Sequence, residues 1–195
     1  VGDVIKSIQE HTSFLMVGTI EPRKGYEQAL AAFEQLWSES EDVNLIIVGK
    51  QGWMVEDFVM KLRNHPESGK HLFWLEDVSD ELLEKIYAGV TCLIASSMGE
   101  GFGLPLIEAA QHKLPIIARD IPVFREVAGK CAYYFDGSEP ALLAKAIQDW
   151  LILYENDQHP ESESMPWQTW KESAAQLSDM IGIDAQVSEN VINGT

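Results

Sequence analysis

Basic residues are scarce in this chain. Its 195 residues include 14 lysines and arginines against 31 aspartates and glutamates, which gives a formal net charge of −17 at pH 7. A surface of this kind repels the phosphates of nucleic acids and the anionic headgroups of membranes. We therefore expect no nucleic-acid partner and no direct membrane binding by this domain. The same scarcity makes any local pair of basic residues a candidate for binding an anion.

Cysteines and long apolar runs are also few. The two cysteines, Cys92 and Cys131, lie in apolar strand-like segments and are expected to be reduced core residues of a cytoplasmic protein. No apolar run is long enough to span a bilayer, no signal segment opens the chain, and its first residue is Val1 and not a methionine. We expect a piece of a longer cytoplasmic protein, whose other parts could hold it at the inner face of the membrane.

Apolar segments alternate with helical patterns along most of the chain. Strands are expected in short apolar runs at residues 13–19, 44–49, 71–75, 91–95, 115–118 and 132–135. Amphipathic segments are expected to form helices at residues 26–37, 55–64, 80–88, 105–111, 123–128 and 139–154. Strands that alternate with such helices predict an α/β fold, a Rossmann-like three-layer domain with a mostly parallel sheet.

The end of the chain is less regular. A polar loop is expected at residues 155–166 and a further amphipathic helix at 167–181, whereas residues 182–195 show no period. With 46% hydrophobic residues, the chain is long enough for one well-buried domain. We expect that domain to cover residues 1–181, with its core at 13–154, and residues 182–195 to form a tail or linker.

The loop at residues 96–105 is the most informative segment. It follows an apolar strand, holds three glycines in five positions and ends at Pro105, which suits the first position of a helix. Glycines allow a close backbone approach and a helix N-terminus attracts anions, so the loop is expected to bind a phosphate-bearing ligand. Glu100 is expected to lie in the cleft, and Glu108 to reach back from the helix toward ligand hydroxyls. The alternative is a tight turn without a ligand, in which Glu108 is an ordinary first-turn acid.

Ligands of parallel sheets bind at the carboxyl ends of the strands. Five loops are expected to meet there, at residues 18–25, 49–53, 76–80, 96–105 and 119–122. The first loop carries Arg23 and Lys24, which could neutralise a diphosphate. The alternative is a solvated turn whose charges pair with Glu21 or Glu27. The histidines show no metal-ligand spacing, so we expect no metal ion and no other cofactor.

Four segments resemble one enzyme family, in that family's order. Residues 100–108 (Glu-Gly-Phe-Gly-Leu-Pro-Leu-Ile-Glu) resemble the E-x7-E signature of retaining glycosyltransferases of family 4, which have the two-domain GT-B fold. Residues 17–25, 78–82 and 119–127 are similar to further segments of the same family. The resemblance implies that this chain is the half of such an enzyme that binds the nucleotide sugar.

The resemblance also implies a role for each loop residue. Glu100 would contact the sugar hydroxyls at the reacting centre, and Glu108 would accept the ribose hydroxyls. Lys24, with Arg23 beside it, would hold the donor diphosphate, and the backbone around Val78 would face the base. The remaining donor-binding positions are Gly18 in the first loop and the backbone N–H groups of Gly101, Phe102, Gly103 and Leu104.

The implied function is transfer of a hexose to a glycan or lipid-linked acceptor in polysaccharide biosynthesis, with the acceptor bound by an N-terminal domain of the same protein. Residues 18–24 resemble bacterial mannosyltransferases, so GDP-mannose is the first expected donor and a UDP-sugar the second. Thr19 stands where many members carry arginine, and Arg23 is the alternative source of that charge. A sugar-nucleotide epimerase of the same fold and a non-catalytic scaffold domain are the remaining alternatives. A dinucleotide-dependent oxidoreductase lacks support, because the glycines do not have the G-x-G-x-x-G spacing.

Overall fold

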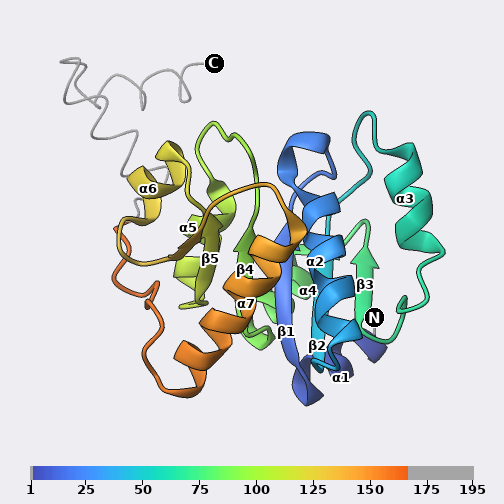
Figure 1. Ribbon diagram of the computed structural model, residues 1–195, viewed down its shortest axis with the longest axis horizontal. Helices are drawn as coiled ribbons and strands as arrows, with labels where there is room; N and C mark the ends of the chain where they lie inside the picture. The colour runs from blue at the N-terminus through green and yellow to red at the C-terminus, as the bar shows by residue number, and fades with distance from the viewer. Residues whose placement is uncertain (1, 167–195) are drawn as a thin grey trace, which may run out of the picture. The chain divides into compact units, whose positions relative to one another are not determined.

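The computed structural model describes residues 2–166, in which the apolar segments form a six-stranded sheet between two layers of helices (Figure 1). The strands are β1 (Thr12–Val17), β2 (Val43–Val48), β3 (Leu72–Leu75), β4 (Cys92–Ala95), β5 (Ile116–Arg119) and β6 (Tyr133–Phe135). The helices are α1 (Gly2–Glu10), α2 (Tyr26–Ser38), α3 (Glu56–Arg63), α4 (Asp80–Gly89), α5 (Leu104–Gln111), α6 (Pro122–Ala128) and α7 (Pro140–Glu155). A short 3-10 turn, η1 (Pro22–Lys24), precedes α2.

All neighbouring strands are parallel, in the order β3-β2-β1-β4-β5-β6. Strands β2 and β3 therefore follow β1 on one side of the sheet, and the chain then crosses to the other side of β1, where β4, β5 and β6 lie. The carboxyl ends of the six strands share one edge of the sheet, called here the carboxyl edge, which lies toward the top of Figure 1. The predicted α/β fold with a mostly parallel sheet is confirmed.

Strand side chains alternate between two cores. Phe14 of β1 packs against Phe33 and Trp150 on the side of α2, α3 and α7, with ring centroids 5.6 and 5.7 Å apart. The next residue, Leu15, belongs to the core on the side of α1, α4, α5 and α6. Strands covered on both faces have little polar surface, which is why β2 reads as an almost unbroken run of valine, leucine and isoleucine.

Two elements were not predicted. Helix α1 buries Val4 and Ile8, which lie one turn apart on one face, and it contacts α4. The turn η1 lies in the loop expected at residues 18–25, for which no helical turn was predicted. The other helices and strands agree with the sequence prediction within a few residues at each end, and among the described residues that follow α7, 156–166, none is in a helix or strand. The expected helix at 167–181, the tail at 182–195 and the domain boundary between them lie outside the described residues.

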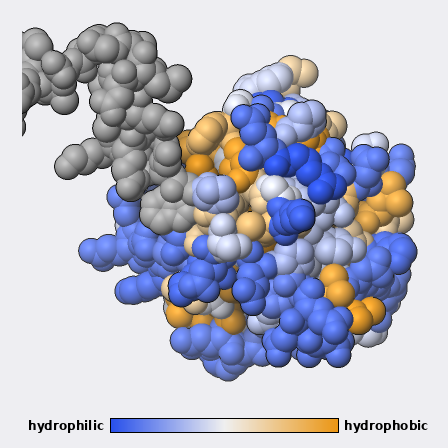
Figure 2. Space-filling view, turned by 90° about the vertical axis from the view of Figure 1, so that its left-hand side faces the viewer, coloured by the Kyte–Doolittle hydropathy of each residue, from blue (hydrophilic) through white to orange (hydrophobic). Residues whose placement is uncertain are grey.

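Both cysteines are free thiols, Cys92 buried and Cys131 half-buried. Burial raises the pKa of the Cys92 thiol well above its usual value. Within residues 2–166, none of the helices combines the length and the apolar composition that crossing a bilayer demands. Figure 2 shows the side of the molecule that carries α5 and α6, where hydrophilic residues dominate and hydrophobic ones form small separate patches.

Candidate functional site

The two loops that the sequence singled out touch each other at the carboxyl edge. The loop at residues 96–105 is called here the glycine loop. The N–H of Met98 in this loop donates to the carbonyl of Arg23 at 2.8 Å. The hydroxyl of Ser96, at the end of β4, donates to the carbonyl of Lys24 at 3.0 Å. Gly25 has a left-handed φ of 74°, and a Cβ there would lie 2.4 Å from the carbonyl oxygen of Ser96. The close approach of the two loops therefore requires a glycine at this position.

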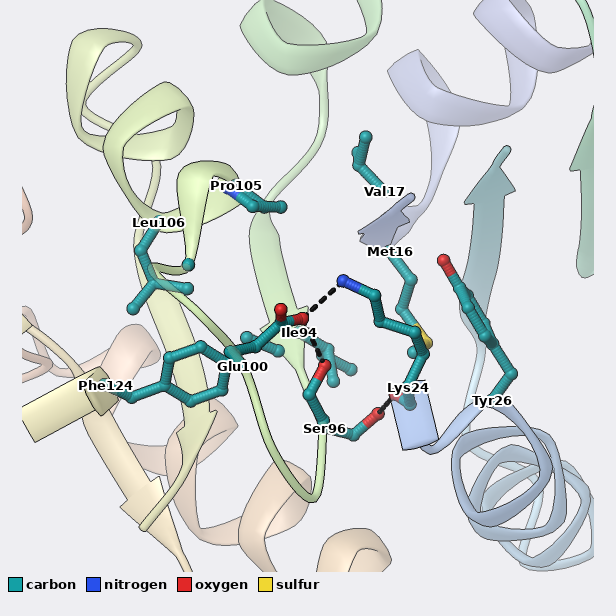
Figure 3. A pocket seen from close by; sticks show the side chains of 13 residues that line it. Met16, Val17, Lys24, Tyr26, Ile94, Ser96, Glu100, Pro105, Leu106 and Phe124 are labelled. Atoms are coloured by element: carbon teal, nitrogen blue, oxygen red, sulfur yellow. Dashed lines mark hydrogen bonds and ion pairs between the residues drawn. The ribbon is translucent and has the colours of Figure 1, made fainter. Parts of the chain in front are cut away.

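Lys24 and Glu100 form an ion pair between these loops (Figure 3). The ammonium of Lys24 and the hydroxyl of Ser97 (2.9 Å) both donate to Oε1 of Glu100, and Arg23 Nη1 donates to Oε2 at 3.1 Å. The Glu100 side chain is only 10% exposed. Burial alone would raise the pKa of this carboxyl, but the three donors outweigh it and hold the pKa below its usual range.

The sequence left open that residues 18–25 form a solvated turn in which Arg23 and Lys24 pair with Glu21 or Glu27. The structure agrees with this alternative in part for Arg23 and not for Lys24. Arg23 is half-exposed, and its Nε lies 3.0 Å from Oε2 of Glu21 while Nη1 also donates to the carbonyl of Gly99. Its contact with Glu100 raises the pKa of the Arg23 guanidinium further. The Lys24 side chain, in contrast, is 15% exposed and points into a pocket toward Glu100.

A narrow pocket lies behind this ion pair. Its walls come from the ends of β1 and β4 and from the first residues of α2, α5 and α6, as Figure 3 shows, and they include Met16, Tyr26, Ile94, Leu106 and Phe124. The free volume is about 20 Å³, enough for a single water. Tyr26 is buried there and donates to the carbonyl of Gly18 at 2.7 Å. The side chains of Lys24 and Glu100 thus close most of the space that an anion would need.

The glycine loop offers backbone donors next to the pair. Gly103 is the N-cap of α5, with a left-handed φ of 84°. Among the described residues, no protein acceptor takes a hydrogen bond from the N–H groups of residues 101–103. The side chains of Phe102 and Leu104 are exposed, so at these two positions only the backbone lies next to the ion pair and the side chains form no packed pocket wall. Free N–H groups at a helix N-terminus suit a phosphate oxygen.

A second and larger pocket, of about 430 Å³, adjoins the first at Val17. The ends of β1, β2 and β3 and the start of α4 line it, including Gly18, Thr19, Val78 and Ser79. Gly18 and Gly49 approach so closely that a Cβ on Gly49 would lie 1.9 Å from the Gly18 carbonyl oxygen. The structure thus places Gly18 and Val78, both predicted from the sequence, in one cavity beside the Lys24 pocket.

Glu108 lies apart from both pockets. It is the fifth residue of α5, half-buried, and it lines neither cavity. Its Oε2 accepts a hydrogen bond of 2.6 Å from the hydroxyl of Tyr87 on α4. Sequence reasoning gave Tyr87 no role, because Tyr87 and Glu108 are 21 residues apart on different helices and no pattern in the sequence shows that they touch.

Arg119 was also missed as a site residue. Its side chain is buried at the end of β5, and Nε donates to the carbonyl of Ser96 at 3.0 Å. The guanidinium also donates to Gln28 and to the carbonyl of Gly137, and it lies 5.0 Å above the ring of Phe135. Burial lowers the pKa of Arg119. The sequence placed Arg119 in a loop expected at the carboxyl edge and in the segment 119–127 that resembles the family, but it gave no sign of these contacts.

Arg119 thus fixes the backbone from which the glycine loop departs. It does so without a carboxylate partner: the ion pairs found within residues 2–166 do not include it. In the same part of the chain, no three histidine, cysteine, aspartate or glutamate side chains gather as metal ligands.

Comparison with known proteins identifies the family. A sequence family described as glycosyl transferases group 1 matches residues 4–164. The serotype-specific mannosyltransferase WbdA of Escherichia coli is 58% identical over 177 residues, which are 91% of this chain and 22% of that protein. The chain therefore spans about a fifth of the length of that relative.

Solved structures share the fold. The C-terminal domain of a glycosyl transferase group 1 family protein (LpcC) from Francisella tularensis has a TM-score of 0.66 at 18% identity, over 78% of this chain and 80% of that one. Anabaena HepE in complex with UDP-glucose has a TM-score of 0.68 at 18% identity, over 99% of this chain and 53% of that one. These identities are low and show the fold alone. The family match and the close relative go further: this chain belongs to the glycosyl transferases group 1 family.

Proposed function

We propose that this chain is the donor-binding domain of a retaining glycosyltransferase, and that its donor is a nucleotide sugar, GDP-mannose first and a UDP-sugar second. One observation carries the proposal: Lys24 and Arg23 contact Glu100, the residue that precedes the N–H groups of residues 101–103, and the pocket that Lys24 and Glu100 line adjoins a cavity of about 430 Å³. The names of the relatives support mannose, since WbdA is a mannosyltransferase. HepE, with bound UDP-glucose, is the reason to retain a UDP-sugar.

Donor binding requires the ion pair to open. The pocket behind Lys24 has about 20 Å³ free, and a diphosphate cannot enter while the Glu100 carboxylate lies between the two cations. A donor phosphate can take over the contacts to Lys24 and Arg23 because it also offers negatively charged oxygens. The released Glu100 carboxylate then lies next to the sugar and can accept its hydroxyls. The nucleoside extends into the larger cavity, with the base near Val78.

The chemistry follows from these positions. When the bond between the anomeric carbon and the phosphate oxygen breaks, negative charge grows on the leaving diphosphate. Once the donor has replaced Glu100 as the partner of Lys24 and Arg23, these cations and the N–H groups of residues 101–103 contact the diphosphate and stabilise that charge. Retention of the anomeric configuration is what the resemblance to family 4 implies. The acceptor belongs to an N-terminal domain of the same protein, and the chain alone is expected to bind donor without transferring sugar.

Titration calorimetry of this chain with GDP and UDP tests the proposal. We expect GDP to bind, and UDP to bind more weakly. Lys24→Met should weaken GDP binding at least tenfold, because it removes a cation that contacts the diphosphate. Lys61→Met is the matched control: Lys61 also pairs with a glutamate, Glu34 at 2.9 Å, but it lines neither cavity of the site.

The controls decide between outcomes. Equal losses for the Lys24 and Lys61 variants would show that the effect is one of net charge and would contradict the site. Tighter binding of UDP than of GDP would mean that the donor is a UDP-sugar and not GDP-mannose. Absence of binding of both nucleotides would overturn the donor-binding role itself.

A further inference from the structure

Tyr87 is hydrogen-bonded to Glu108 of α5, the helix that follows the glycine loop. The tyrosine hydroxyl donates to Oε2 of Glu108 at 2.6 Å, a distance typical of an O–H group that donates to a carboxylate. Tyr87 is itself buried. Burial, and then the contact with Glu108, raise the pKa of Tyr87, so the hydroxyl stays protonated and remains a donor at neutral pH.

The position of that hydroxyl is fixed from the other side of the ring. Tyr87 stacks on His112 with ring centroids 5.0 Å apart and an angle of 5° between the planes. His112 directly follows α5 and lies one helical turn beyond Glu108, while its Nε2 lies 3.4 Å from Oε2 of Glu84. The tyrosine ring therefore lies flat along α5 and reaches back to Glu108. A hydroxyl on a ring held in this way restricts the carboxylate to few orientations.

Tyr87 also connects Glu108 to the larger cavity. Leu83, which lines that cavity, precedes Tyr87 by one turn on the same helix, so both side chains occupy one face of α4. The start of α4 supplies Val78 and Ser79 to the same cavity. One helix, α4, thus borders the proposed base site and also contacts Glu108, to which the family resemblance gives the ribose.

We propose that Tyr87 is a positioning residue, which orients Glu108 to accept ribose hydroxyls and so makes the chain prefer ribonucleotide over deoxyribonucleotide donors. The inference rests on the proposed function and on the role that the resemblance to family 4 implies for Glu108, which is to accept the ribose hydroxyls of the donor. Tyr87 engages Oε2, and among the described residues no hydrogen bond reaches Oε1, so that oxygen is the one left to accept a ligand hydroxyl. A carboxylate that is already oriented loses less conformational freedom on binding, and the benefit appears only with a ligand that carries the matching hydroxyl.

Calorimetry of this chain with GDP, 2′-deoxy-GDP and 3′-deoxy-GDP tests the inference. Of the two deoxy analogues, the one that lacks the hydroxyl bound by Glu108 should bind more weakly. We expect the unmodified chain to bind GDP about tenfold more tightly than this analogue, because a hydrogen bond to a charged group is lost. Tyr87→Phe keeps the ring on His112 and removes the hydroxyl. It should weaken GDP binding about fivefold and leave binding of that analogue nearly unchanged. The UDP series replaces the GDP series if UDP is the ligand that binds.

A matched control removes another tyrosine hydroxyl. Tyr134 donates to the carbonyls of Phe124 and Gly129, at 3.1 and 3.0 Å, and contacts no residue of the proposed ribose site. Tyr134→Phe should leave the ratio of GDP to deoxy-GDP affinity unchanged. His112→Ala, which removes the surface that supports the ring but keeps the hydroxyl, should lower the ratio about twofold. It also keeps the inference testable if Tyr87→Phe does not fold.

The outcomes separate the inference from the function on which it rests. If the unmodified chain binds GDP and its deoxy analogues equally, Glu108 does not read the ribose, and that part of the proposed function fails. If the unmodified chain discriminates and Tyr87→Phe discriminates equally well, the positioning role of Tyr87 is wrong. An equal loss for all three nucleotides in Tyr87→Phe would also overturn it, since a purely structural defect has that effect.

Discussion

The ammonium group of Lys24 donates to the carboxylate of Glu100, 76 residues further along the chain, and this contact joins the two loops of the site. Arg23 contacts the same carboxylate through its other oxygen. A protein with a net charge of −17 thus keeps two cations in place at the carboxyl edge by giving them an internal anion. In the proposed function, the same arrangement keeps the cationic site ordered before a donor phosphate binds.

The first prediction concerns acid stability. The pKa of Glu100 is lower in the folded chain than its usual value of about 4.3, so the group stabilises the fold above that value and loses its effect as the pH falls through the lowered pKa. Glu100→Gln should cost about 1 kcal/mol at pH 7, because one partner of a partly solvated ion pair is removed. The difference from the unmodified chain should shrink below about pH 4. Urea denaturation at pH 7, 5 and 3.5 measures it.

An exposed acid provides the control for this series. Glu155, the last residue of α7, is exposed. Glu155→Gln should show a nearly constant difference across the three pH values. A pH-independent loss in Glu100→Gln would mean that the Glu100 carboxylate is not stabilised by Lys24 and Arg23.

The second prediction concerns the glycine between η1 and α2. Gly25→Ala places a Cβ 2.4 Å from the backbone oxygen of Ser96, and it also strains a φ of 74°. Gly69 has a φ of 78° with nothing within 4 Å of the added Cβ. Gly69→Ala should therefore cost about 1 kcal/mol for the left-handed backbone alone, and Gly25→Ala about 3 kcal/mol or more. Chemical denaturation compares the two, and equal losses would show that the loops separate without penalty.

The third prediction concerns the buried arginine of β5. Arg119→Met leaves Gln28 Oε1 and the carbonyl of Ser96 without their donor and removes one of two donors to the carbonyl of Gly137, which should cost about 3 kcal/mol. Arg119→Lys should recover part of the loss, because a single ammonium reaches fewer of these acceptors. Both variants should weaken nucleotide binding, since Ser96 leads into the glycine loop.

Arg125 is the comparison for Arg119. It also contacts an aromatic ring, Tyr134 at 3.7 Å, and makes two hydrogen bonds to Asp120, but at the surface. Arg125→Met should have little effect on thermal stability. Similar effects of the two methionine variants would contradict a structural role that is particular to Arg119.

The fourth prediction separates an enzyme from a scaffold. In the full-length protein that carries this chain, Glu100→Ala should lower the rate of sugar transfer at least 100-fold, because the proposed contact to the sugar at the reacting centre is lost. Glu34 also lies in a network of ion pairs, with Lys61 and His65, but away from the carboxyl edge. Glu34→Ala should leave the rate within about twofold. An unchanged product yield in Glu100→Ala would favour the scaffold alternative.

The sequence predicted the sheet well because the relevant signals are local. Each strand is a short apolar run, and buried parallel strands require such runs on both faces. Helix α1 was not predicted: its buried residues Val4 and Ile8 form a single apolar pair one turn apart, and only the contact with α4 gives that pair a partner.

The site was predicted in part for the same reason. Arg23, Lys24 and Glu100 stood out because each lies in a loop that follows a strand, and parallel topology brings such loops to one edge. The contacts of Arg119 and Gln28, 91 residues apart, and of Tyr87 and Glu108 depend on the tertiary packing of helices and strands. Periodicity says which face of a helix is buried but not which side chain it meets, so these partners require the structure.

The two cavities differ in how freely their walls can change. A substitution at Lys24 also disturbs Ser96, Ser97 and Glu100. Ser96 donates to the backbone carbonyl of Lys24, and Ser97 donates to the Glu100 carboxylate that pairs with Lys24. The rim of the larger cavity carries Lys50 and Asp77, an ion pair that is largely exposed on both sides. Mutations there cost the fold little. The proposed base site can therefore change by substitution more easily than the proposed phosphate site, whose side chains depend on one another.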